Sequence, residues 1–162
     1  MNFLIFFLVI LNFETNANEG TVEIKNPIFT TKGVDGNPYE IKAEKGYQNK
    51  NYLDLFVIEA KLKTTDYGWI YLQADTGTFN QSSGEIELNS NIIVYTESDE
   101  KIFSDLAFVN TNDRIIILTN NVIYQDKKIE IRANKSIIDN EFSKIIYSGN
   151  VKSKIINKIS NE

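Results

Sequence analysis

Apolar and polar residues alternate along most of the chain from Thr21 onward. In one stretch Tyr39, Ile41 and Ala43 alternate with Glu40 and Lys42. The same alternation places further apolar residues on one face at Ile70, Leu72 and Ala74, at Ile86, Leu88, Ile92 and Val94, at Ile116, Leu118 and Val122, and at Ile129, Ile131 and Ala133. A period of two with a single apolar face is typical of a half-buried antiparallel strand, and no helical period follows Gly20. The pattern therefore predicts an all-β domain of about nine to eleven short strands.

These stretches recur at a nearly constant interval. The residue pairs Asn91-Ile92, Asn121-Val122 and Asn150-Val151 lie 30 and 29 residues apart, and a second set of positions, Ala43, Ala74, Ser104 and Ala133, is spaced by 31, 30 and 29 residues. Self-similarity at such a period marks a repeat architecture, because one unit cannot bury its apolar face alone. Each unit of about 30 residues is expected to hold two strands, and the last unit closes in Ile145–Ser153.

Small or polar residues interrupt the second strand of most units. Ser90, Asn120 and Gly149 each come directly before an Asn-Ile or Asn-Val pair. Within a strand, such positions predict a bulge or a bend. The second strand of the first unit, Leu53–Leu62, is apolar on both parities from Leu55 to Ile58, so the pattern does not define its register.

The N-terminal segment differs from the rest of the chain. Phe3–Leu11 is an unbroken apolar run, shorter than the about 20 residues that span a bilayer. It fits the apolar region of a secretory signal, with Thr15-Asn16-Ala17 resembling a cleavage site, although no Lys or Arg precedes it. A third interpretation is that it ends a longer anchor whose start lies upstream. We therefore predict a hydrophobic helix in residues 1–17, as a membrane anchor or a signal, that sends the following residues across a membrane.

Composition narrows the chemistry. Hydrophobic residues make up 42% and charged residues 24%, which is typical of a globular domain. The net charge of −5 argues against a nucleic-acid partner held by phosphate neutralisation. Cysteine and histidine are absent, which excludes disulfides, thiol nucleophiles and histidine acid–base chemistry. Because the chain also has no phosphate loop or hydrolase motif, we predict that it is not an enzyme and has no catalytic residue, no metal site and no cofactor.

The apolar face and the last strand each allow two interpretations. In a small sandwich the inward residues are ordinary core, whereas in a wide or V-shaped roll they would line a groove for acyl chains, whose burial is worth about 0.8 kcal/mol per CH₂. Tyr147–Ile155, interpreted as one last strand, carries Lys152 and Lys154 but no proline. It is either a docking edge for another chain or an edge covered by the C-terminal tail.

Several spaced motifs, taken together, resemble the LptC family of lipopolysaccharide transport proteins. They are Ile-Lys-Asn-Pro-Ile-Phe at 24–29, Val-Asp-Gly-Asn-Pro-Tyr at 34–39, Tyr-Glu-Ile-Lys-Ala-Glu-Lys-Gly at 39–46, Tyr-Leu-Gln-Ala-Asp-Thr-Gly-Thr-Phe at 71–79, Gly-Glu-Ile-Glu-Leu-Asn-Ser-Asn-Ile at 84–92, and Ala-Asn-Lys at 133–135 with Ser-Gly-Asn-Val at 148–151. The resemblance covers about residues 20–155. Its closing unit is shared with the related periplasmic bridge protein LptA, while the Asp-Gly turn and the strand before Ala43 favour LptC.

The resemblance implies a twisted, V-shaped antiparallel β-jelly roll, residues 18–157, in the periplasm, tethered to the inner membrane by a single N-terminal helix. It implies a transport component without catalysis that receives lipopolysaccharide from the ABC transporter LptB2FG and passes it to LptA, shielding the acyl chains inside the roll. The N-terminal edge and the membrane helix would contact LptF and LptG, and the C-terminal edge would contact LptA.

Transferred to this chain, these roles fall on two sets of residues. The lipid path would comprise Ile70, Leu72, Ala74, Ile86, Leu88, Ile92, Val94, Ile102, Leu118, Val122, Ile129 and Ile131. The edge that faces LptA would comprise Tyr147, Gly149, Val151, Ser153 and Ile155, followed by a tail at residues 158–162.

Two other interpretations stay open. Cleavage after Ala17 would favour a soluble, LptA-like periplasmic bridge that binds lipopolysaccharide and assembles edge to edge. A fully closed apolar face would favour a β-sandwich binding module of another kind.

Overall fold

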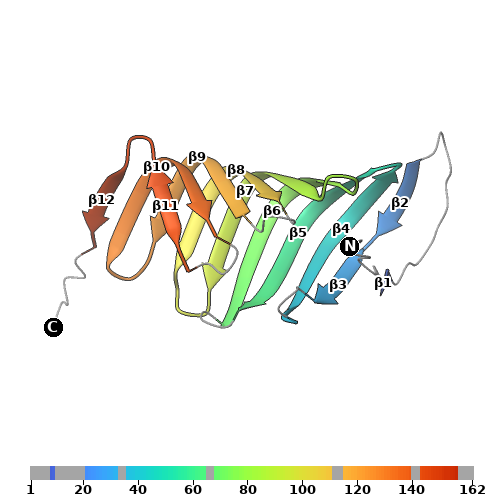
Figure 1. The fold of residues 1–162 in the computed structure, drawn as a ribbon, viewed down its shortest axis with the longest axis horizontal. Coiled ribbons are helices and arrows are strands. Elements are labelled where there is room, and N and C mark those ends of the chain that lie inside the picture. The colour runs from blue at the N-terminus through green and yellow to red at the C-terminus, as the bar shows by residue number, and fades with distance from the viewer. Residues whose placement is uncertain are drawn as a thin grey trace, which may run out of the picture.

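The alternating stretches form one antiparallel sheet whose two ends do not meet (Figure 1). The computed structural model describes residues 8–9, 21–32, 36–64, 68–110, 115–139 and 143–156. Within these ranges the chain forms a 12-stranded sheet and no helix, which confirms the all-β prediction. From β3 to β11 each strand pairs with the next strand in sequence, while β2 pairs with β4, β12 with β10, and β1 with β3.

The strands have the following bounds: β1 Leu8–Val9, β2 Thr21–Lys25, β3 Ile28–Lys32, β4 Pro38–Asn49, β5 Tyr52–Thr64, β6 Gly68–Asn80, β7 Glu85–Thr96, β8 Lys101–Asn110, β9 Ile115–Gln125, β10 Ile129–Ile138, β11 Ile145–Ser148 and β12 Lys152–Ile155. The strand predicted at Tyr147–Ile155 is thus divided into two short strands. They pair with different parts of β10, because the chain turns at Gly149-Asn150.

The predicted N-terminal helix is not shown. Of residues 1–17 the structure describes only Leu8–Val9, which form β1 against β3, and the rest of that segment lies outside the described residues. The predicted tail at 158–162 lies outside them as well. In the described ranges, no helix is long and apolar enough to span a bilayer.

The predicted interruptions are corners at which the strands bend. Ser90-Asn91, Asn120-Asn121 and Gly149-Asn150 all have positive φ, between 51° and 71°. In β7 and β9 these pairs coincide with one-residue shifts in the pairing register. Such a bulge bends the strand locally and increases its twist. Asparagine and glycine tolerate the left-handed conformation that the bend needs, which explains the recurring Asn.

Side chains on neighbouring strands brace two of these corners. The Asn91 amide Nδ2 donates to Asp75 Oδ2 at 2.7 Å, and the Asn121 Nδ2 donates to Asp105 Oδ2 at 2.5 Å. In both, a side-chain amide is held by a side-chain carboxyl group of the neighbouring strand. The repeating Asp and Asn therefore form equivalent braces in successive units.

The first corner has a different construction. In β5 a single residue, Val57, has a positive φ of 55°, whereas the other corners are pairs that include an asparagine. The pairing register with β4 and β6 does not shift there, but the inward parity of the side chains does: Leu53 and Leu55 point inward before the corner and Ile58 points inward after it. This reversal explains why the apolar pattern of Leu53–Leu62 gave no single register.

The corners divide the sheet into two layers. Layer A comprises residues 28–32, 38–42, 58–64, 68–73, 92–96, 101–104, 122–125, 129–132 and 152–155, and layer B comprises 21–25, 45–49, 52–56, 76–80, 85–89, 106–110, 115–119, 135–138 and 145–148. Tyr124 of layer A and Tyr147 of layer B have ring centroids 6.1 Å apart. Their partners on β10, Ile131 and Ser136, would be about 17 Å apart on a straight strand. The layers therefore fold over to face each other.

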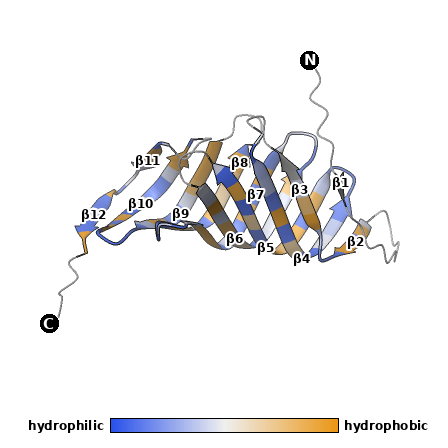
Figure 2. Cartoon of the chain, turned by 90° about the horizontal axis from the view of Figure 1, so that it is seen from below, coloured by the Kyte–Doolittle hydropathy of each residue, from blue (hydrophilic) through white to orange (hydrophobic). Residues whose placement is uncertain are grey.

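The core lies between the two layers. Its buried apolar residues come from both: Ile24, Phe29, Ala43, Leu53, Leu55, Ile58, Ile70, Ala74, Leu88, Ile92, Val94, Ile102, Ala107, Leu118, Val122, Ala133 and Ile138. Hydrophobic and hydrophilic residues alternate along the strands as expected for such a two-sided sheet (Figure 2).

Candidate functional site

All twelve residues predicted for the lipid path lie on the inner faces of the layers. Eight of them are buried core residues: Ile70, Ala74, Leu88, Ile92, Val94, Ile102, Leu118 and Val122. The other four, Leu72, Ile86, Ile129 and Ile131, remain partly exposed. The predicted face is thus a continuous apolar interior, most of which is filled by its own side chains.

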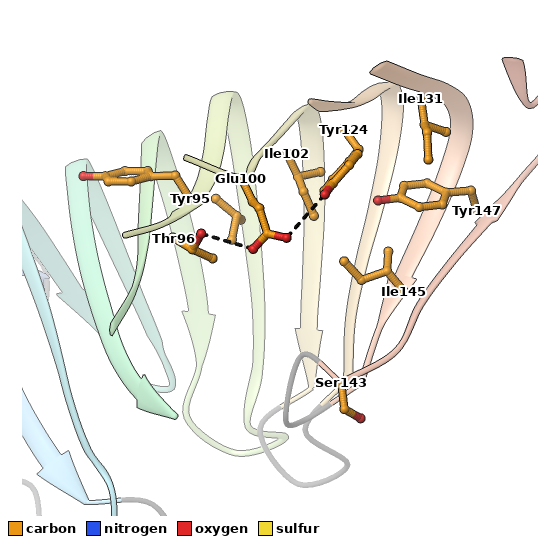
Figure 3. Close-up of a pocket in the computed structure, with 10 residues that line it drawn as sticks. Tyr95, Thr96, Glu100, Ile102, Tyr124, Ile131, Ser143, Ile145 and Tyr147 are labelled. Carbon is orange, nitrogen blue, oxygen red and sulfur yellow. Dashed lines mark hydrogen bonds between the residues drawn. The ribbon is translucent and has the colours of Figure 1, made fainter. Parts of the chain in front are cut away.

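The interior opens near the C-terminal end of the sheet, where a pocket of about 330 Å³ lies between the layers (Figure 3). Its lining residues are Val94, Tyr95, Thr96, Glu100, Ile102, Tyr124, Ile131, Ser143, Ile145 and Tyr147, but the Tyr95 ring itself points away from the others (Figure 3). Layer A contributes Ile102, Tyr124 and Ile131, and β11 of layer B contributes Ile145 and Tyr147. A volume of this size is at the small end of the range for ligand pockets, about 300–1,000 Å³.

Tyr124 and Tyr147 shape the mouth of the pocket. The Tyr124 hydroxyl lies 3.2 Å from Asp126 Oδ2 and 3.4 Å from Glu100 Oε1, so it donates to this acidic pair. Burial, together with these two carboxylates, raises the pKa of Tyr124 well above the usual range for tyrosine. Burial and Glu100 raise the pKa of Tyr147 in the same direction. Both hydroxyls therefore remain protonated, and the mouth combines aromatic walls with hydroxyl groups.

The turns at the mouth are held by local hydrogen bonds. Asp126 Oδ1 accepts from the backbone N–H groups of Lys128 and Ile129, each at 2.7 Å, which fixes the turn between β9 and β10 and lowers the pKa of Asp126. In the preceding turn Glu100 Oε2 accepts from the hydroxyls of Thr96 and Ser98, both at 3.3 Å. The mouth thus has a fixed acidic rim over an apolar floor.

The residues predicted for the partner edge separate into two groups. The side chain of Tyr147 points into the pocket (Figure 3). Val151 and Ile155 are 51% and 74% exposed, and Ser153 is exposed beside them. Gly149 has a φ of 71° at the turn between β11 and β12, where an added Cβ would lie 3.0 Å from the Cβ of Asn134. In the described part of the chain, β11 and β12 each pair with β10 alone, which leaves their outer edges open.

Part of the pocket was not predicted from the sequence. Of its lining residues, only Val94, Ile102 and Ile131 were among the predicted lipid path. Ile145 and Tyr147 share a parity in the sequence, which could have placed both on the inner face. Tyr124 shares the parity of Val122, so alternation placed it on the inner face as well, without marking it as part of a pocket. Glu100 gave no such signal, because it lies in a polar turn.

The pocket between the layers can enclose apolar chains. Its walls are aliphatic and aromatic, its carboxylates lie at the rim, and both layers contribute lining residues. No known protein-family model matches this chain, and no curated protein matches its sequence.

Proposed function

We propose that this chain is an LptC-like component of lipopolysaccharide transport whose interior shields acyl chains. The observation that carries the proposal is the pocket between Tyr124 and Tyr147, whose walls include Val94 and Ile102 of the apolar interior between two unclosed layers. An acyl chain gains about 0.8 kcal/mol for each CH₂ group removed from water, which is enough to draw it between such walls.

The two facing layers, joined along a line of corners, support the finer description of the fold as a V-shaped jelly roll. In this proposal residues 1–17 form the inner-membrane anchor and the β-domain lies in the periplasm. The chain acts by holding and passing on lipid, without catalysis.

The acidic rim limits how lipopolysaccharide would enter. Glu100 and Asp126 lie at the mouth and would repel the phosphates of the lipid. We therefore expect the acyl chains to enter the pocket while the phosphorylated sugars stay outside the rim.

The open edges support transfer between partners. Strands β11 and β12 end the two layers at the C-terminal end, and β2 ends layer B at the other. An unpaired edge can accept a strand from another chain. In this proposal LptA adds to the C-terminal edge, and LptF and LptG contact the N-terminal edge and the membrane helix.

Photocrosslinking tests the lipid path. A photoreactive residue replaces Ile131, which lines the pocket, or Ile117, which lies on the outer face of layer B beside Ile137. With the purified full chain and lipopolysaccharide, we expect a lipid crosslink at position 131 and none at 117. Equal labelling at both positions, or none at 131 in a folded variant, would contradict the proposal.

The alternative, a soluble LptA-like bridge, has the same pocket and the same open edges. The two differ in whether residues 1–17 are retained as an anchor or cleaved off. The intact mass of the protein in the membrane and periplasmic fractions distinguishes these outcomes.

A further inference from the structure

The outer face of layer A carries a strip of aromatic and aliphatic side chains. The alternation that turns Ile92 and Val94 inward turns Ile93 and Tyr95 outward. The members of this aromatic strip are Trp69, Tyr71, Ile93, Tyr95, Phe103 and Ile123, all partly exposed. They are cross-strand neighbours, because Tyr71 pairs with Tyr95, Ile93 with Phe103, and Phe103 with Ile123. The strip therefore runs without a break from β6 to β9.

Lysines surround the aromatic end of the strip. The Tyr71 and Tyr95 rings are stacked, with centroids 5.1 Å apart and planes 15° apart. The ammonium groups of Lys61 and Lys63 lie 5.4 and 5.3 Å from the centroid of the Trp69 ring. Both are cation–π contacts. A lysine side chain can keep its ammonium group in water while its methylene stem covers apolar surface.

The charge of this face is opposite to that of the whole chain. Its outward charged residues, among those whose side chains the structure describes, are Lys42, Lys61, Lys63, Lys101, Arg132, Lys152 and Lys154, against Glu40, Glu59 and Glu130. These residues have a net charge of +4, in a chain whose net charge is −5. Two of the three glutamates are already paired: Glu40 lies 3.1 Å from Lys42, and Glu130 lies 2.7 Å from Arg132.

At its C-terminal end the face contains a hollow of about 490 Å³. Arg132 and Lys152 line it together with three asparagines and three apolar residues: Asn121, Asn134, Asn150, Val122, Ile123 and Ala133. Arg132 and Lys152 are directly opposite each other on β10 and β12. Like charges in this position repel, and Glu130 supplies one carboxylate beside these two cations, so the hollow suits an anion.

We propose that the outer face of layer A docks on the surface of an anionic lipid bilayer. The aromatic strip would lie at the level of the head groups, the lysines would contact lipid phosphates, and the hollow would take one head-group phosphate. Tyrosine, tryptophan and lysine are the side chains that membrane interfaces favour, and basic residues near an anionic leaflet are attracted to it. The inference concerns the outer face, so it holds or fails independently of what the interior carries.

The outer face of layer B provides the contrast. Phe108, Ile115 and Ile146 are exposed there, but Glu85 and Glu87 are on the same face. Its apolar row has no accompanying excess of lysine. Charge complementarity to an anionic surface is therefore a property of layer A.

Trp69, the only tryptophan in the chain, makes the proposal measurable. The full chain is reconstituted with vesicles of phosphatidylcholine, with or without phosphatidylglycerol, whose acyl chains are brominated to quench nearby tryptophan. We expect a blue shift and quenching of Trp69 with phosphatidylglycerol. Both should diminish in about 1 M salt, where the screening length is about 3 Å. Because the reporter is on the proposed face, insertion of the N-terminal segment alone would not quench it.

Two charge variants sharpen the test. The double variant Lys101→Glu with Lys152→Glu reverses two charges on the face and leaves the residues that contact Trp69 unchanged. It should lower the affinity for phosphatidylglycerol vesicles, measured by Trp69 quenching, at least about tenfold. Lys50→Glu with Lys135→Glu makes the same change in charge away from the face and should have no effect. The proposal is overturned if Trp69 is quenched equally in phosphatidylcholine alone, if it is not quenched in either vesicle, or if both variants weaken quenching equally. A blue shift that rises with protein concentration in the absence of vesicles would instead assign the face to a second copy.

Discussion

The N-terminal and C-terminal parts of the sheet differ in how tightly the two layers meet. Toward the N-terminus, Leu53 and Leu55 of layer B and Ile58 of layer A are 4%, 7% and 4% exposed. A Cβ added to Gly77 there would lie 2.7 Å from Leu88 Cδ2 and 2.8 Å from Ile58 Cδ1, so side chains of both layers occupy that space. Toward the C-terminus, Ile129 and Ile131 stay partly exposed and the pocket opens.

The difference arises from the sizes of a few side chains. In the closed part, Gly46 and Gly77 are small enough for leucines of the neighbouring strands to lie over them, and at Gly77 Ile58 of the facing layer also reaches this space. In the open part, Tyr124 and Tyr147 hold the layers apart at the mouth, above the small residues Ala133 and Ser136. One repeating unit therefore produces both a packed core and a binding pocket, depending on where its large residues lie.

The largest expected effect comes from removing a side chain in the closed part. Leu55→Ala should lower the free energy of unfolding by about 3 kcal/mol, because it leaves a cavity in a packed interior. Ile131→Ala should cost about 1 kcal/mol, because its side chain already borders open space. Urea denaturation of both variants measures the two costs. Equal losses of unfolding free energy would show that the two layers pack equally tightly in both parts of the sheet, and would contradict the difference between them.

Exchanging residues between corners should have a smaller effect. Val57 is a β-branched residue in the left-handed region, so Val57→Asn should stabilise the protein by about 1 kcal/mol. The reverse change at an asparagine corner, Asn121→Val, should destabilise by about 2 kcal/mol, because it adds that strain and leaves Asp105 without its amide donor. Thermal melts of the two variants and of Asn121→Gly, which removes the amide without the strain, separate the two causes. Opposite signs at the two corners are the essential outcome.

The sequence predicted much of the fold because alternation reports directly on burial. Ile92, Leu118 and Val122 are on the inner face where their parity placed them, and the corners lie at Ser90, Asn120 and Gly149, the residues that interrupted the pattern. Val57 was not recognised as a corner, because valine rarely adopts a positive φ and carries no such signal. The division of the last strand at Gly149-Asn150 was missed because its two parts keep the same parity.

The candidate site was harder to predict because its openness depends on contacts between layers. Alternation shows that Ile129 and Ile70 face inward, but not that the first is partly exposed and the second is buried. That distinction is set by side chains in the facing layer, such as Tyr147 opposite Tyr124, which are distant in sequence.

The smallest predicted effect concerns alkaline pH at the mouth of the pocket. Burial keeps Tyr147 protonated above pH 10, the ordinary tyrosine pKa being about 10. The unfolded chain therefore releases this proton at a lower pH than the folded chain. The stability that the group contributes is fully present below about pH 10 and is lost as the pH rises beyond it. Tyr147→Phe should lose less stability than the wild type between about pH 9 and 11, measured by urea denaturation at each pH. Tyr52→Phe, at a half-exposed ring in the other part of the sheet, should follow the wild type. If Tyr147→Phe and the wild type had parallel pH profiles, the Tyr147 hydroxyl would be open to water, and the mouth of the pocket would be wider than its aromatic walls suggest.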